Sequence, residues 1–157
     1  MTAQDVIKAL NLEPLTMEGG YFRRTYCSKE NTPEGKPMGT AIYYLLTPDS
    51  FSRLHKLPTD EIYHFYMGDP VELTILDPNG TGKTVLLGND LKKGMTPQFC
   101  VPGNCWQGSC LAEGGAWALV GTTMAPGFAD EDFVPGIREV LIARFPTFQE
   151  KIQKLTP

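Results

Sequence analysis

The sequence predicts an all-β fold, an antiparallel sandwich or barrel with short helices at its two ends. Two observations favour this class. Glycine and proline are abundant, with 16 and 13 residues in a chain of 157, which leaves little room for long helices. Short runs rich in β-branched and aromatic residues follow one another, and turn residues rather than helical patterns separate them. A doubly wound α/β fold is therefore disfavoured.

The N-terminal helix is expected to be short. Thr2 and Asp5 have the spacing of a capping box, and the apolar residues that follow share one helix face. Pro14 ends this pattern, and the strand-like runs begin after it. We expect strands at 21–26, 40–47, 51–55, 61–67, 71–76, 84–88, 98–101, 106–111 and 116–123.

Two short helices are expected at the C-terminal end. Residues 138–145 have a helical pattern that Pro146 ends, and Thr147 and Glu150 have the spacing of a second capping box. Neither helix is long enough to do more than cover the β body. No internal repeat or linker is evident, so residues 1–157 are expected to form a single domain.

The charge pattern excludes several classes of partner. The net charge is −4 and there is no run of basic residues, which argues against nucleic acid or an anionic membrane as a partner. No apolar stretch is long enough to span a membrane, and no signal-peptide pattern is present, so we expect a cytoplasmic protein. The cysteines match no zinc-binding or redox spacing, and we expect reduced, packed thiols at Cys27, Cys100, Cys105 and Cys110.

His55 and Glu61 form the most informative pair in the sequence. His55 ends one expected strand, Glu61 begins the next, and residues 58–60 can turn the chain between them. Neighbouring antiparallel strands can therefore aim an imidazole and a carboxylate into one space. Such a pair can ligate a metal, or the carboxylate can orient the histidine as a general base. A surface ion pair and a buried, hydrogen-bonded histidine are the structural alternatives.

His64 is the other histidine of the chain, but strand alternation separates it from Glu61. Glu61, Tyr63 and Phe65 are expected on one face of the strand, and His64 on the other. We therefore expect His64 to be a structural or rim residue unless a β-bulge re-aims it.

Several blocks of the sequence resemble the cupin superfamily. Glu61 and Gly68 match the end of the first cupin motif, and residues 102–107 take the place of the second. The wider set resembles the uncharacterised cupin type 5 subfamily, and it comprises residues 18–22, 60–61, 68–70, 101–102 and 120–128. This resemblance implies a small jelly-roll barrel with a pocket at its open end, assembled as a homodimer. It implies no single activity, because cupins include sugar-nucleotide 3,5-epimerases, metal-dependent isomerases, dioxygenases and binding proteins.

The chain departs from the general cupin pattern at the metal ligands. Arg53 replaces the first histidine of the His-x-His pair, and Gln107 replaces the histidine of the second motif. The implied divalent metal set is thus reduced to His55, Glu61 and Gln107, and a neutral amide is a poor ligand. Since catalytic zinc or iron keeps at least three protein ligands, the sequence disfavours a tightly bound metal.

Further ligand-binding candidates come from strand alternation. Tyr21 and Arg23 share one strand face, and Arg24 lies on the other. An inward arginine suits a carboxylate or phosphate, and the subfamily likeness favours Arg23. Tyr44, Tyr63 and Tyr66 are candidate proton donors, and the sequence does not select among them. Trp106 can either stack on a sugar or base ring or belong to the core.

The sequence therefore predicts a cupin that binds a small polar, anionic metabolite in its barrel. If the protein is an enzyme, the hypothesis is proton transfer of the epimerase or isomerase type. In that hypothesis His55 is the base, Glu61 orients it and Arg23 holds the anionic group. The alternatives are a metal-dependent cupin enzyme and a binding or sensor protein without turnover.

Overall fold

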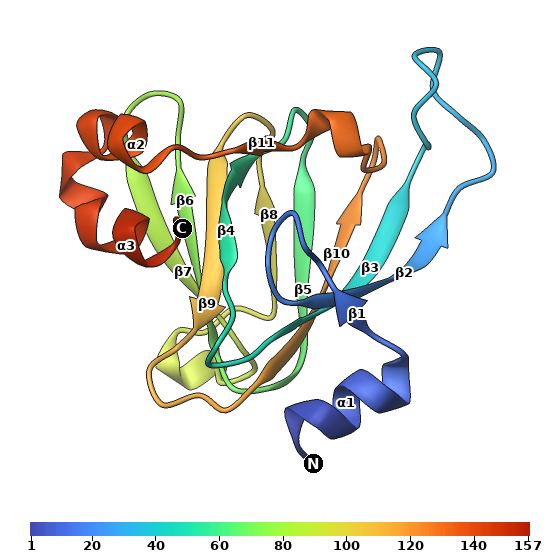
Figure 1. Ribbon diagram of the computed structural model, residues 1–157, viewed down its shortest axis with the longest axis horizontal. Coiled ribbons are helices and arrows are strands. Elements are labelled where there is room, and N and C mark those ends of the chain that lie inside the picture. Colours follow the sequence, from blue (N-terminus) through green and yellow to red (C-terminus); the bar gives the residue numbers. More distant parts are fainter.

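The computed structural model describes residues 1–157 as two antiparallel β-sheets that face each other, with helices on the outside (Figure 1). The strand order is β1-β2-β3-β10-β5-β8 in the larger sheet and β11-β4-β9-β6-β7 in the smaller one. The strands of the larger sheet are β1 (Glu13–Pro14), β2 (Tyr21–Cys27), β3 (Thr40–Leu46), β5 (Glu61–Gly68), β8 (Gln98–Val101) and β10 (Ala118–Met124). Those of the smaller sheet are β4 (Ser52–Lys56), β6 (Val71–Leu76), β7 (Gly82–Leu87), β9 (Trp106–Leu111) and β11 (Val134–Pro135).

The all-β prediction is confirmed, with the arrangement of a jelly roll rather than a closed barrel. Each expected strand is present to within a few residues at its ends. The two strands that were not predicted, β1 and β11, have two residues each, which is too short for any alternation to be visible in the sequence.

The helices are α1 (Ala3–Leu10), α2 (Arg138–Arg144) and α3 (Gln149–Lys154). The capping box at α1 is confirmed, because Thr2 N donates to Asp5 Oδ2 and Asp5 N donates to Thr2 Oγ1. The prediction of a second capping box, at Thr147 and Glu150, is wrong. Pro146–Phe148 forms a 3-10 turn, and α3 follows it without a side-chain cap. No helix is both long and apolar enough to cross a membrane.

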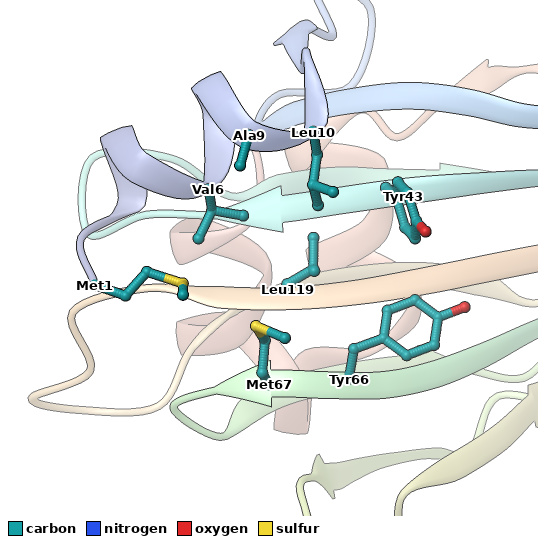
Figure 2. A pocket seen from close by; sticks show the side chains of 8 residues that line it. All are labelled: Met1, Val6, Ala9, Leu10, Tyr43, Tyr66, Met67 and Leu119. Atoms are coloured by element: carbon teal, nitrogen blue, oxygen red, sulfur yellow. The ribbon is translucent and has the colours of Figure 1, made fainter.

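The core has three parts. The largest lies between the sheets and includes Tyr63, Leu73 and Val120. Helices α2 and α3 cover the outer face of the smaller sheet, where Leu141 and Ile152 are buried (Figure 1). Helix α1 covers part of the outer face of the larger sheet, above an apolar hollow of ≈ 420 Å³ (Figure 2).

The cysteines are all free, but only two of them are packed. Cys105 and Cys110 are buried as predicted, one between the sheets and one beneath the C-terminal helices. The prediction of packed thiols is wrong for Cys27 and Cys100, which are exposed.

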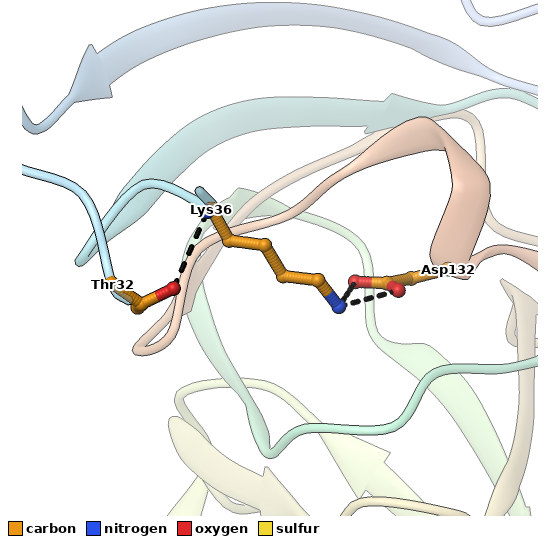
Figure 3. A network of polar contacts seen from close by, with 3 residues as sticks. All are labelled: Thr32, Lys36 and Asp132. Carbon is orange, nitrogen blue, oxygen red and sulfur yellow. Dashed lines mark hydrogen bonds and ion pairs between the residues drawn. The ribbon is translucent and has the colours of Figure 1, made fainter. Parts of the chain in front are cut away.

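An ion pair ties the β2–β3 loop to the segment that precedes β11 (Figure 3). Lys36 Nζ lies 2.6 Å from both carboxylate oxygens of Asp132, and the side chains are 27% and 14% exposed. Thr32 supports the loop, because its hydroxyl oxygen accepts a hydrogen bond from Lys36 N.

Asp132→Asn is expected to destabilise the protein by about 0.5–1 kcal/mol, since this pair is short and partly shielded from solvent. Asp90→Asn is the matched control, because its pair with Lys93 spans 3.4 Å between largely exposed side chains and should change nothing measurable. Urea denaturation of the three proteins provides the comparison. Equal effects of the two substitutions would show that the Lys36 pair is no better than a surface ion pair.

Candidate functional site

A cavity of ≈ 560 Å³ opens between the 13–18 segment and the inner face of the larger sheet. Seven of its 16 lining residues are hydrophobic, which suits a ligand with both polar groups and an apolar face. The charged groups on its wall are Glu13, Glu18, Arg24, Glu61 and Asp130. The cavity therefore combines several carboxyl groups with a single cation.

Glu61 begins β5 and brings a shielded carboxyl to the cavity wall. The residue is 7% exposed, and its Oε2 has no hydrogen-bond partner. Burial raises the pKa of Glu61 to about 7, and the charge of Glu18 adds to this, whereas His55, Thr122 and Gln107 oppose it. The Glu61 carboxyl can thus take up or release a proton near neutral pH.

His55 lies behind Glu61 rather than on the cavity wall. Its ring stacks on Phe133 at 4.8 Å, and its Nδ1 lies 2.7 Å from the Arg53 carbonyl oxygen. Because a carbonyl only accepts, Nδ1 carries the ring proton of neutral His55 and Nε2 carries none. Burial lowers the pKa of His55, while the neighbouring Glu61 charge opposes that shift. The two side chains interact through charge, without a hydrogen bond between them.

Tyr63 and Gln107 join the two sheets behind the cavity. The Tyr63 hydroxyl, from β5, donates to Gln107 Oε1, from β9, over 2.8 Å, and both side chains are buried. Gln107 pairs with His55 across β4 and β9, so the register places it beside His55. Thr122 and, to a smaller extent, Gln107 lower the pKa of Glu61, although neither bonds its Oε2.

Tyr63→Phe is expected to destabilise the protein by about 1–2 kcal/mol, because it leaves the buried Gln107 oxygen without a donor. Tyr66→Phe, at an exposed tyrosine of the same strand, is the control and should change stability by less than about 0.5 kcal/mol. Chemical denaturation of both variants measures the difference. A Tyr63→Phe variant as stable as the wild type would contradict the described link between the sheets.

The proposed metal set does not fit a tightly bound divalent ion. Gln107 Oε1, the atom that would ligate, accepts from Tyr63, and an amide NH₂ is not a metal ligand. No three His, Cys, Asp or Glu side chains converge at any point of the chain. His55 and Glu61 therefore lack the third donor that catalytic metals need.

The expectation that Arg23 points into the pocket is wrong, because the strand register places its neighbour there. Phe22 and Arg24 lie on the cavity wall together with Ile42, which pairs with Arg24. Arg23 lies on the outer face, with its guanidinium 5.5 Å from the centre of the Tyr43 ring. Tyr21 packs on that same outer face, beside the cluster under α1.

Three other candidates also lie outside the cavity. Trp106 packs beside the cluster under α2 and α3, with Lys56 Nζ 4.9 Å from its ring centre, so its ring cannot stack on a ligand in the cavity. His64 lies on the outer face, as alternation predicts, where its Nε2 is 3.0 Å from Thr123 Oγ1. Arg53 lies beside His55 in β4, and its Nε has no partner.

Glu18 is the main site residue that the sequence did not single out as chemical. Its Oε1 accepts a hydrogen bond of 2.5 Å from Ser52 Oγ, and burial raises the pKa of its carboxyl to about 7. Its carbonyl oxygen accepts from Arg53 N over 2.9 Å, so the segment is tied to β4. The glycines at 19 and 20 were the available signal, since a glycine pair marks a chain segment that passes close to other backbone.

Comparison with known proteins agrees with this architecture. Residues 4–134 match the family model described as "Cupin superfamily (DUF985)". An uncharacterised protein of Saccharomyces cerevisiae, YML079W, is 32% identical over 133 residues, which is 73% of this chain and 66%, just under two thirds, of the yeast protein.

Solved structures extend the likeness to the whole chain. The crystal structure of protein SO0799 from Shewanella oneidensis has a TM-score of 0.93 at 36% identity and covers 100% of this chain and 98% of that one. A hypothetical protein from Leishmania major has a TM-score of 0.90 at 31% identity, with 99% coverage of both chains. Oxalate decarboxylase from Bacillus subtilis shares the fold at 20% identity and a TM-score of 0.57, over 88% of this chain and 36% of its own. The chain belongs to the cupin superfamily, in its DUF985 family.

Proposed function

We propose that the protein binds a small polar metabolite in the cavity and catalyses proton transfer of the isomerase or epimerase type, with Glu61 as the proton-transferring residue. The observation that carries this proposal is the position of Glu61, which lies on the cavity wall, is 7% exposed and has no hydrogen-bond partner for its buried Oε2. A carboxyl with a pKa of about 7 is matched to proton transfer at neutral pH.

His55 then acts as a positioning residue instead of the base. It does not line the cavity, and its Nδ1 is held by the Arg53 carbonyl. When protonated, its charge stabilises ionised Glu61 and so favours release of the Glu61 proton. This assignment exchanges the roles that the sequence suggested for the two residues.

The residues on the cavity wall favour a ligand with an anionic group at one end. Arg24 is the cation on the wall and is exposed, so its planar guanidinium can bind a carboxylate or phosphate at the solvent side. Phe22, Leu57 and Met124 provide apolar surface for a carbon skeleton. The uncharged, reacting part of the ligand then faces Glu61.

The test is hydrogen exchange in D₂O with aldoses, ketoses, uronic acids, sugar phosphates and nucleotide sugars, followed by mass spectrometry. We expect deuterium on carbon in at least one compound, and an about 10²–10⁴-fold lower rate in Glu61→Gln. His64→Gln, on the outer face, should keep the wild-type rate. No exchange with any compound would reject the enzyme, and a compound that raises the melting temperature without exchange would instead indicate a binding or sensor protein.

A further inference from the structure

Glu18 is another of the carboxyl residues on the cavity wall, and a rigid support holds it there. The Tyr44 hydroxyl donates to the Gly19 carbonyl oxygen over 2.8 Å, and Arg53 N donates to the Glu18 carbonyl oxygen. A side chain at Gly19 would place its Cβ 2.1 Å from the Phe51 carbonyl oxygen. The segment is therefore fixed between β3 and β4, which are in different sheets.

The two carboxyl groups approach the cavity from different supports. Glu61 is the first residue of β5 in the larger sheet, whereas Glu18 is anchored to β4 of the smaller sheet through Ser52 and Arg53. Ser52 is fully buried, and its hydroxyl bonds only one of the two Glu18 carboxylate oxygens. A ligand between the supports can thus be contacted by a carboxyl from each side.

We propose that Glu18 is a second catalytic residue that works as a pair with Glu61 on opposite faces of one ligand carbon, an inference that rests on the proposed function. The substrate class is a carbon acid, with a C–H bond next to a carbonyl group. Ionised Glu61 takes the proton, and the electron pair of the broken C–H bond moves into the carbonyl to give an enolate. Protonated Glu18 then gives its proton to the other face of that carbon. The configuration inverts, Glu61 ends protonated and Glu18 ionised, and exchange with water restores the starting state.

Electrostatics supports a state in which one carboxyl is protonated and the other is ionised. Glu61 is buried and Glu18 is half-buried, and the charge of Glu18 raises the pKa of Glu61, so two ionised groups together are unfavourable. The other titratable and charged groups around the pair are Glu13, Arg24, Tyr44, Arg53, His55, Tyr63 and Asp130.

The first test needs no substrate and follows the carboxyl carbons of ¹³C-glutamate-labelled protein by NMR. Glu18→Gln should lower the titration midpoint of Glu61 by about 0.5–1 pH unit, because it removes a like charge. Glu13→Gln, at an exposed carboxyl of the same cavity, should lower it by less than half as much. Ser52→Ala offers a second variant that keeps the carboxyl and should raise the midpoint of Glu18. An unmoved Glu61 midpoint in Glu18→Gln would overturn the pairing, whatever the fate of the proposed function.

The second test uses any compound into which the wild-type protein introduces deuterium. Glu18→Gln should still exchange hydrogen from the epimer whose proton faces Glu61, and should invert configuration at least about 100-fold more slowly. Wild-type inversion in Glu18→Gln would overturn the role of Glu18 and leave that of Glu61 intact. Equal losses of exchange and inversion in a folded Glu18→Gln variant would also overturn the role of Glu18. Absence of exchange in the wild type would reject the proposed function itself, and the catalytic pairing with it.

Discussion

Glu61→Gln is expected to stabilise the folded protein by an amount that grows from about 1 kcal/mol at pH 5 to about 3 kcal/mol at pH 8. The folded-state pKa of Glu61 is raised to about 7 from an ordinary value of 4.5, so the folded chain holds this proton over a pH range in which the unfolded chain has lost it. Wild-type stability therefore falls as pH rises through that range, because ionising a shielded carboxyl is costly. Glutamine removes the ionisation and keeps the shape.

The measurement is the free energy of unfolding in urea at pH 5, 6, 7 and 8 for wild type and variant. Glu13→Gln is the control, since Glu13 lies on the same cavity wall but is exposed, and its difference from wild type should be small at every pH. If Glu61→Gln were destabilising at pH 8, the carboxylate would have to be stabilised by interactions that the structure does not contain.

Gly19→Ala is expected to destabilise the protein by about 3 kcal/mol or more, or to prevent folding. Gly19 has φ 106°, and its added Cβ would lie 2.1 Å from the Phe51 carbonyl oxygen, a backbone atom that cannot rotate away. The 13–18 segment would have to move off β4, and Glu18 would leave the cavity wall with it.

Gly80→Ala separates the effect of the backbone conformation from the effect of the steric clash. Gly80 has φ 94°, but no atom lies within 4 Å of the added Cβ, so only the backbone conformation is penalised, by about 1 kcal/mol. Thermal unfolding should place Gly19→Ala about 6–10 °C below the wild type and Gly80→Ala about 2–4 °C below it. Equal shifts for the two variants would mean that the 13–18 segment is not clamped against β4.

Most of the fold could be predicted from the sequence, because strand periodicity and turn residues are local signals. The strand at 71–76, for example, has the predicted ends, since turns bound it on both sides. One error concerns the start of a helix. Thr147 does not cap α3, because Pro146 begins a 3-10 turn that delays the helix.

Less of the candidate site could be predicted from the sequence. Alternation correctly separated His64 from Glu61, but it cannot say which face of a strand is the inner one. That choice depends on pairing with β3, and it places Arg24 rather than Arg23 on the cavity wall. The relation of Glu18 to Glu61 depends on contacts between residues far apart in the chain, and no periodicity reports these.

The carboxyl titration of Glu61 in the wild-type chain tests the central claim most directly. The ¹³C resonance that disappears in Glu61→Gln identifies the group, and its chemical shift is followed from pH 3 to pH 9. A midpoint near 7 is the predicted result, because the cavity wall shields this carboxyl and leaves Oε2 without a donor. A midpoint near 4.5 would contradict the account, since the Glu61 carboxyl would then not be shielded at the cavity wall, and its pKa would not be matched to proton transfer at neutral pH.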